Sequence, residues 1–174
     1  TLDNTAGIIQ TNADTLNIST ATLDNTQGKI LHAGATRAQI TAAELTNNAG
    51  EIISNASLAI NDANISNHAG TLSAVNITVD GENLDNRDGI IDGDTININL
   101  AGNLLNDNNA YLAAQSLVDN GLLLTIEGLL RNEGTLGTNA DSAQISAQNF
   151  NNTGRVVHAG NGVLRLDVQK ALVN

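Results

Sequence analysis

Carboxylates are the densest group of residues in this chain that could do chemistry. Within positions 80–94, Asp92 and Asp94 flank a glycine and would offer two oxygen ligands to Ca²⁺. Arg87 interrupts the run, however, and the glycine-rich nonapeptide of calcium-binding β-rolls is absent. We therefore expect solvated turn residues and no metal site. The acids of this run are Asp80, Glu82, Asp85, Asp88, Asp92 and Asp94.

The three histidines are too dispersed to share a metal ion. His32 and His158 are each followed by Ala-Gly and hold the same place in a repeated pattern, with His68 in a turn between them. Six repeats of a stacked β structure would place His32 and His158 roughly 30 Å apart. Imidazole ligands lie at about 2 Å from a metal, so we expect three independent surface histidines.

A glycoside-cleaving enzyme is the other activity that the acids suggest. It needs two carboxyl groups about 5–10 Å apart in one groove. Sugar grooves also use aromatic side chains, and this chain has one Tyr and one Phe. Its basic residues are spread over several repeats, and near-uniform repeats leave little room for groove-forming loops. We expect no enzymatic activity and no cofactor.

A repeated motif organises all of these residues. An apolar residue is followed two positions later by Asn, and then by a short turn, at successive steps of 21, 22, 20, 19, 20, 26 and 20 residues. A period near 20 along the whole chain predicts one structural unit stacked on itself. The anchors are Leu2-x-Asn4, Leu23-x-Asn25, Leu45-x-Asn47, Ile65-x-Asn67, Leu84-x-Asn86, Leu104-x-Asn106, Leu130-x-Asn132 and Phe150-x-Asn152.

Each repeat has the pattern of short strands separated by turns. In residues 23–44 the apolar residues alternate with polar ones around Leu23, Ile30 and Ile40, which is the period of a β-strand. Helical repeats are longer, and the Leu-x-Leu-x-x-Asn order of leucine-rich repeats is missing. The chain is therefore predicted to be an all-β parallel solenoid of about eight coils, roughly 20 residues each. With strands ~4.8 Å apart, the rod would be roughly 40 Å long.

Two columns of polar or small residues should support the stack. The anchor asparagines would either hydrogen-bond to one another along the axis or cap their own turns. The turn glycines are expected to supply a positive φ, with Asn109 replacing glycine in the sixth repeat. The asparagines are Asn4, Asn25, Asn47, Asn67, Asn86, Asn106, Asn132 and Asn152, and the glycines are Gly7, Gly28, Gly50, Gly70, Gly89, Gly134 and Gly154.

Composition narrows the partners. The net charge of −11 argues against nucleic acid and anionic membrane surfaces, and no apolar stretch is long enough to insert into a membrane. Pro and Cys are absent, so no proline interrupts the strands and no disulfide or thiolate site is possible. Residues 1–174 are expected to be a single segment excised from a longer array. Its exposed coil ends would favour end-to-end self-association.

The motif Leu-Asp-Asn-x-x-Gly-x-Ile, at Leu23–Ile30 and Leu84–Ile91, resembles the repeats of filamentous haemagglutinin-like proteins. These are bacterial two-partner secretion exoproteins, including large adhesins and the effectors of contact-dependent growth inhibition. The resemblance covers the whole chain and implies a right-handed parallel β-helix on the bacterial surface or secreted from the cell. It also implies export by an outer-membrane transporter, and a shaft that carries a binding or toxic region away from the cell.

One step of 26 residues, between Leu104 and Leu130, breaks the period. Insertions in solenoids tend to protrude on one face, often the binding face. Candidate binding residues are therefore Tyr111, Leu112 and Gln115 in this irregular coil at about 104–129; the alternative is a local bulge or cover without a partner. Two functions follow: a structural shaft, or a segment that binds a host receptor, a glycan or an outer-membrane protein of a neighbouring cell.

Overall fold

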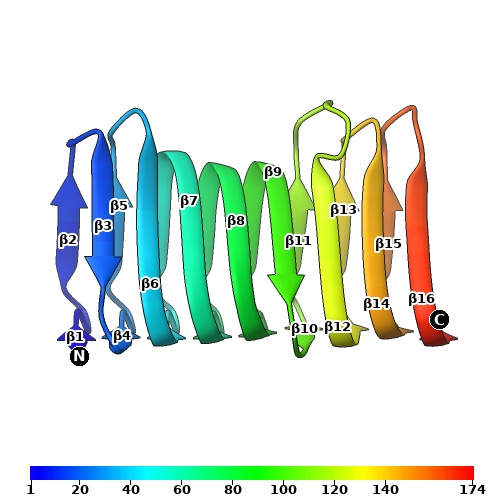
Figure 1. Ribbon diagram of the computed structural model, residues 1–174, viewed down its shortest axis with the longest axis horizontal. Coiled ribbons are helices and arrows are strands. Elements are labelled where there is room, and N and C mark those ends of the chain that lie inside the picture. Colours follow the sequence, from blue (N-terminus) through cyan, green and yellow to red (C-terminus); the bar gives the residue numbers. More distant parts are fainter.

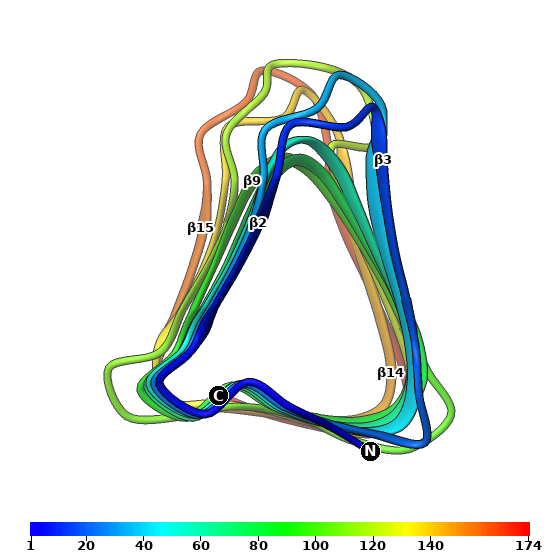
Figure 2. The same cartoon turned by 90° about the vertical axis from the view of Figure 1, so that its left-hand side faces the viewer.

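The computed structural model describes all of residues 1–174 and has no helix. The chain forms a parallel β-solenoid of about 8 coils with about 21 residues per coil. Figure 1 shows the coils side by side along one axis, and Figure 2 shows their triangular cross-section. Seen from the N-terminal end, the chain ascends along β2 (Ile8–Thr11) and descends along β3 (Thr15–Ser19) while receding, so the solenoid is right-handed.

Three sheets form the sides of the triangle. The anchor face contains the Leu-x-Asn motifs, and the second and third faces follow it along the chain. Strands confined to one face are β1 (Leu2–Asp3), β4 (Thr22–Asp24) and β10 (Leu104–Asn106) on the anchor face, β2, β5 (Lys29–His32), β11 (Tyr111–Ala114), β13 (Thr135–Thr138) and β15 (Arg155–His158) on the second face, and β3 on the third face.

Other strands bend around one or two corners without interruption. In the middle of the rod the corners contain only one or two residues, so a single strand continues from face to face. These strands are β6 (Arg37–Thr46), β7 (Glu51–Ser66), β8 (Thr71–Asp85), β9 (Ile90–Leu100), β12 (Leu122–Asn132), β14 (Ala143–Asn152) and β16 (Leu164–Val173).

Equivalent residues of successive coils pair in parallel and in register. Leu2 pairs with Leu23, which pairs with Leu45, and the anchors continue in this way to Phe150 and Leu172. Each inward side chain therefore lies directly on the same position of the next coil. We number the coils 1–8 by their anchors, so coil 6 begins at Leu104 and coil 7 at Leu130.

The core is a narrow column of aliphatic side chains. A cluster of 31 buried residues runs the length of the rod, and Phe150 is its one aromatic member. Such stacks suit Leu, Ile and Val because branched side chains pack well on a pleated surface. The equivalent residues at the C-terminal end are less enclosed, with Leu166 41% and Leu172 53% exposed. No helix is long and apolar enough to span a membrane.

The turn glycines act differently from the sequence prediction, which was wrong about their backbone. No glycine has a positive φ. In five of the seven turns the residue before the glycine has one, as in Gln27 (55°) and Ala49 (52°), whereas the residues before Gly134 and Gly154 do not. The glycine is required because coils approach closely there. A Cβ on Gly28 would lie 2.2 Å from the backbone oxygen of Asn4, and one on Gly50 would lie 2.2 Å from that of Asn25.

The prediction for Asn109 was also wrong, by one residue. The pairing of Tyr111 with Ile90 aligns Ala110, not Asn109, with Gly89. Coil 6 has an additional residue in its anchor turn, and the positive φ falls on Asn108 (59°). Ala110 is 2% exposed, so this place in the turn is as enclosed as the glycine places.

Most of the longer step in coil 6 is a loop at the corner between the second and third faces. It spans residues 115–121, between β11 and β12, and protrudes at the top of the rod (Figure 1). Its tip exposes Leu117 (70%) and Val118 (48%). Relative to coil 5, the rest of the step is the one additional residue in the anchor turn.

A pair of neighbouring substitutions tests the role of the turn glycines. Gly50→Ala should lower the free energy of unfolding by about 2–4 kcal/mol, because its Cβ would collide with the preceding coil. Ala49→Gly should leave it unchanged or raise it by up to about 1 kcal/mol, because a left-handed backbone is unfavourable for alanine. Urea unfolding followed by circular dichroism measures both. Equal effects of the two substitutions would contradict this assignment.

Candidate functional site

The anchor asparagines form a continuous ladder through the rod. Each Nδ2 donates to the Oδ1 of the asparagine in the next coil, over 2.6–2.8 Å, in eight hydrogen bonds from Asn4 to Asn174. Asn25, Asn47 and Asn67 are 0% exposed. The polarity is constant, with the amide nitrogen directed toward the C-terminal end.

From Asn4 to Asn132, each of these amides also donates to a backbone carbonyl oxygen of a turn or of the following strand. Asn47 Nδ2 also lies 3.3 Å from the Gly50 carbonyl oxygen and 3.2 Å from that of Thr71 in the next coil. Both roles considered from the sequence, ladder and turn contact, are therefore combined in one side chain. Because these amides are buried and hydrogen-bonded within the rod, the column is structural and presents nothing to a ligand.

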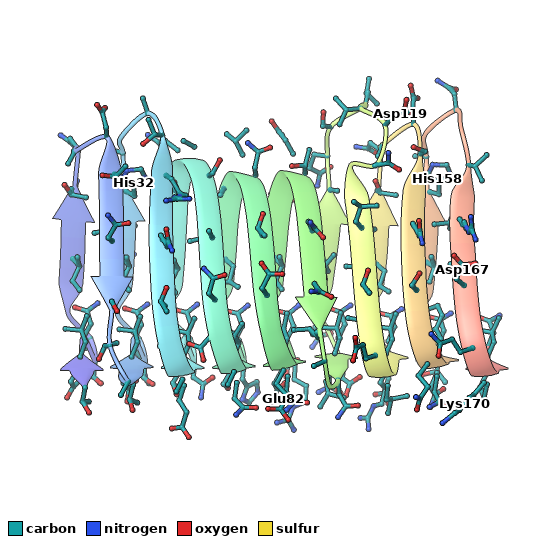
Figure 3. The ribbon with its side chains drawn as sticks, in the orientation of Figure 1. His32, Glu82, Asp119, His158, Asp167 and Lys170 are labelled. Carbon is teal, nitrogen blue, oxygen red and sulfur yellow. The ribbon has the colours of Figure 1, made fainter.

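His32 contradicts the expectation of a surface imidazole. It is 2% exposed, at the corner between the second and third faces. Its Nδ1 lies 2.9 Å from Ser54 Oγ and its Nε2 lies 3.0 Å from the Ala13 carbonyl oxygen. The imidazole thereby ties three coils together. His158 is half-buried against the Ala140 carbonyl oxygen, far along the rod from His32 (Figure 3).

The acidic run is distributed over all three faces. Asp85 pairs with Arg87 on the anchor side, and the side chain of Asp92 accepts a hydrogen bond from Gln115 on the second face. Partial burial would raise the pKa of Asp85, but the hydrogen bonds and charge of Arg87 outweigh it and hold that pKa below its usual range. No three His, Asp or Glu side chains gather closely enough to hold a metal ion.

Asp62 is a buried carboxylate inside coil 3. It faces the core at the corner of the third and anchor faces, 4% exposed, stacked between Ala42 and Gly81. Its Oδ1 accepts from the Asn64 N–H over 3.2 Å, and Oδ2 has no partner. Burial raises its pKa to about 6, against the opposing hydrogen bonds from Asn64 and Ala63.

Asp107 is the second buried acid, in the enlarged anchor turn of coil 6. It is 1% exposed, and Arg131 Nη2 of coil 7 lies 2.7 Å from its Oδ2. The two groups are close but poorly aligned for a hydrogen bond, so their attraction is mainly coulombic. Burial raises the pKa of Asp107 although the Arg131 charge opposes the shift. This ion pair closes the irregular coil onto its neighbour.

The candidate binding residues of the irregular coil separate in the structure. Leu112 is 0% exposed and points into the core, so it was wrongly included, because strand β11 continues the regular stack. Tyr111 is 37% exposed. Gln115 Nε2 donates to Tyr111 Oη (3.1 Å) and Asp92 Oδ1 (2.9 Å), while its Oε1 accepts from Asn139 Nδ2 (3.1 Å).

Five concave regions of about 290–600 Å³ lie on the surface, and two of them are candidates for a site. A groove of about 460 Å³ crosses coils 3–6 on the anchor face, where Thr46, Ser66 and Asn83 surround the side chains of Leu105 and Leu129. A depression of about 290 Å³ lies on the second face at coils 6–8, lined by Tyr111, Ala113, Gln115, Thr135, Gly137, Thr138, Asn139, Arg155 and Val157. The first has no cation, whereas the second combines an aromatic ring, amides and a guanidinium group.

Comparisons with protein-family models, curated proteins and solved structures find no significant match.

Sequence reasoning missed Asp62, Asp107 and the depression on the second face. In the sequence Asp62 looks like any acid of a polar turn. Its side chain faces the core only because of the corner at which the residue lies, and the sequence does not show that corner. The depression joins residues of three coils, and only the register of the strands brings Tyr111 and Arg155 to the same face. Gly137 offered a signal: it stands inside an otherwise regular strand pattern.

The ladder is tested by comparing a buried asparagine with an exposed one. Asn67→Ala removes an acceptor from Asn47 and a donor from Asn86, and should lower the free energy of unfolding by about 2–4 kcal/mol. Asn97→Ala, at an exposed position of the third face, should change it by less than about 0.5 kcal/mol. Urea unfolding distinguishes them, and similar losses for both would contradict a buried ladder.

Asp62 should make stability depend on pH. Its folded pKa is raised to about 6, so its stabilising contribution is complete below the unfolded value of 3.8 and is lost as pH rises through 6. Asp62→Asn should therefore be about 2–3 kcal/mol more stable than wild type at pH 8, and similar to it at pH 4. Urea unfolding across this range measures the difference. Asp80→Asn, an exposed position, is the control; a pH-independent difference for Asp62→Asn would refute the assignment.

Proposed function

We propose that this chain is a rigid structural shaft. The observation that carries the proposal is the unbroken asparagine ladder, which joins all eight coils without a gap, including the irregular one. A ladder of this kind holds the register of successive coils and leaves no place along the axis where the rod could bend at a hinge.

The backbone supports the same conclusion. Hydrogen bonds between coils run parallel to the axis on all three faces, so bending the rod in any direction stretches one sheet. Gly–carbonyl close contacts and the buried ion pair of Asp107 and Arg131 add points of contact between coils. In a repeat protein each unit is stabilised by its neighbours, so stiffness extends along the array.

We further propose that the shaft belongs to an exported bacterial surface filament. The support is the resemblance of the repeats, at Leu23–Ile30 and Leu84–Ile91, to filamentous haemagglutinin-like proteins. The shaft would project a binding or toxic region from the cell, after export by an outer-membrane transporter of the two-partner type. It would have no catalytic activity of its own.

A recognition segment is the alternative function, and one feature favours it. Coil 6 is where the regular surface is interrupted, by the loop at 115–121 and by the exposed ring of Tyr111. The hydrogen bonds of Gln115 to Tyr111 and to Asn139 hold this part of the surface in one arrangement. A shaft and a recognition segment are compatible, since a rigid rod presents a fixed patch well.

Rigidity can be measured with two spin labels. Because the chain lacks cysteine, Thr5→Cys and Thr153→Cys place labels in the anchor turns of coils 1 and 8. Double electron–electron resonance should give a narrow distribution of the distance between the two labels, centred near seven coil spacings, about 34 Å. Deleting residues 45–64, one complete coil, should shorten the mean by about 4.8 Å without broadening it. A broad distance distribution would contradict a rigid shaft.

Surface export is tested by antibody labelling of cells that produce the protein. Labelling of these cells only after lysis would contradict surface export.

A further inference from the structure

The depression on the second face lies between coils 6 and 8. Its floor is formed by Ala113 and Gly137, which face away from the core, are paired in the sheet and are both buried beneath the side chains around them. Tyr111 of coil 6 and Arg155 of coil 8 stand on either side of Thr135, two coil spacings or about 10 Å apart. Its volume of about 290 Å³ is at the lower limit of ligand pockets, which suits one small ring.

Gly137 is the only glycine of the chain that the stacking does not require. For each of the other fifteen, a Cβ would come closer than 3.0 Å to another atom. At Gly137 the nearest atoms would be Ala113 Cβ at 3.5 Å and Thr135 Cγ2 at 3.9 Å, which is ordinary contact, and φ is not positive. A glycine inside a strand weakens it and often marks a place where a ligand approaches the backbone.

Other coils show that a side chain fits this column. Leu31, Ile53, Ser73 and Val157 occupy the same outward position as Gly137. Branched residues are favourable in strands, so glycine gives up stability here. Its effect is that no side chain fills the floor of the depression at this position.

The polar groups around the floor have unused hydrogen-bonding capacity. Tyr111 Oη accepts from Gln115 Nε2, which leaves its own hydrogen free to donate. Asn139 Nδ2 donates to Gln115 Oε1, and Asn139 Oδ1 accepts no hydrogen bond. Neutral donors and acceptors at close spacing, beside an aromatic ring, match the hydroxyl groups and the apolar face of a sugar.

Arg155 supplies a positive charge at the far side. In a chain with 18 acidic residues, Lys29, Arg87, Arg131 and Arg165 are all paired with carboxylates, but Arg155 is not. A guanidinium group without a partner favours a planar anion that it can bind through two hydrogen bonds. The nearest acid of the Gln115 network, Asp92, lies in coil 5, three coil spacings or about 14 Å away along the axis.

We propose that this depression binds an acidic sugar, a pyranose ring with a carboxylate. The ring would lie over Gly137 beside Tyr111, with its hydroxyl groups on Tyr111 Oη and Asn139 and its carboxylate on Arg155. A peptide fits less well, because the backbone of β13 is fully paired with β11 and β15 and offers no edge for a further strand. The net charge of −11 would repel a long polyanion, so a short oligomer or a chain end is the ligand.

The inference deepens the recognition alternative and does not depend on the shaft. The probe is trigalacturonic acid, titrated into ¹⁵N-labelled protein and followed by NMR. The backbone amides of Gly137 and Asn139 and the side-chain amide of Gln115 should shift. Fully methyl-esterified trigalacturonate has the same rings without charge. It should bind at least about tenfold more weakly than the acid.

Gly137→Val is the decisive variant. It should abolish the shifts at Asn139 and Gln115 while the thermal midpoint stays the same or rises, because valine fills the floor and favours a strand. Gly137→Ala should weaken binding partially. Ser73→Val, in the same column three coils away, is the matched control and should bind as wild type. Arg155→Ala should lose the preference for the acid over the ester, whereas Arg37→Ala, another arginine without a carboxylate partner, should keep it.

Three results would overturn the proposal: no shifts with the acid, equal binding of acid and ester, or unaltered binding by Gly137→Val. Tighter binding of a sulfated pyranose than of the uronate would overturn the choice of a carboxylate. The recognition alternative fails separately, if alanine substitution of Tyr111, Gln115, Ser116 and Leu117, which leaves the core residue Leu112 unchanged, leaves attachment of the protein to target cells intact. If attachment is lost while uronate does not bind, recognition stands and the sugar assignment falls.

Discussion

Registration of one coil on the next is the constraint on which the rest of this structure depends. The Asn ladder and the glycine turns set it at the same corner of the triangle. The amide of Asn47 bonds forward to Asn67, and Gly50 allows the turn to approach the Asn25 carbonyl oxygen. Because side chains in a strand alternate with a period of two, a slip of one residue would turn every core residue outward. The polar column thereby specifies which aliphatic residues are buried.

This division of roles explains what the sequence could and could not predict. The period and the alternation around Leu23, Ile30 and Ile40 were sufficient for the fold class, since they depend on local pattern alone. The backbone of the turns was not predictable, because the glycine is demanded by the preceding coil while Gln27 or Ala49 adopts the left-handed conformation. Position within a coil is visible in the sequence, whereas contacts between coils require the exact register.

The same limit applies to the candidate site. Tyr111 and Gln115 were identified because they lie where the spacing fails, but Leu112 was included with them although strand alternation turns it into the core. Gly137 and Arg155 lie in regular coils and carry no anomaly of spacing. Only the pairing of β11, β13 and β15 places them beside Tyr111. A site on a solenoid is assembled across coils, so a reading along one repeat cannot find it.

In a repeat protein, a residue that departs from the repeat suggests a function only when the stacking of the coils does not account for it. Asn67 and Gly70 need no function, because stacking accounts for them completely. Asp107 and Arg131 are irregular, yet they attract each other as an ion pair and close the enlarged turn. Gly137 remains: stacking permits a side chain there, strand propensity favours one, and the neighbouring coils have one. A residue that weakens its strand without serving the stack is best explained by the space that its missing side chain leaves above the sheet.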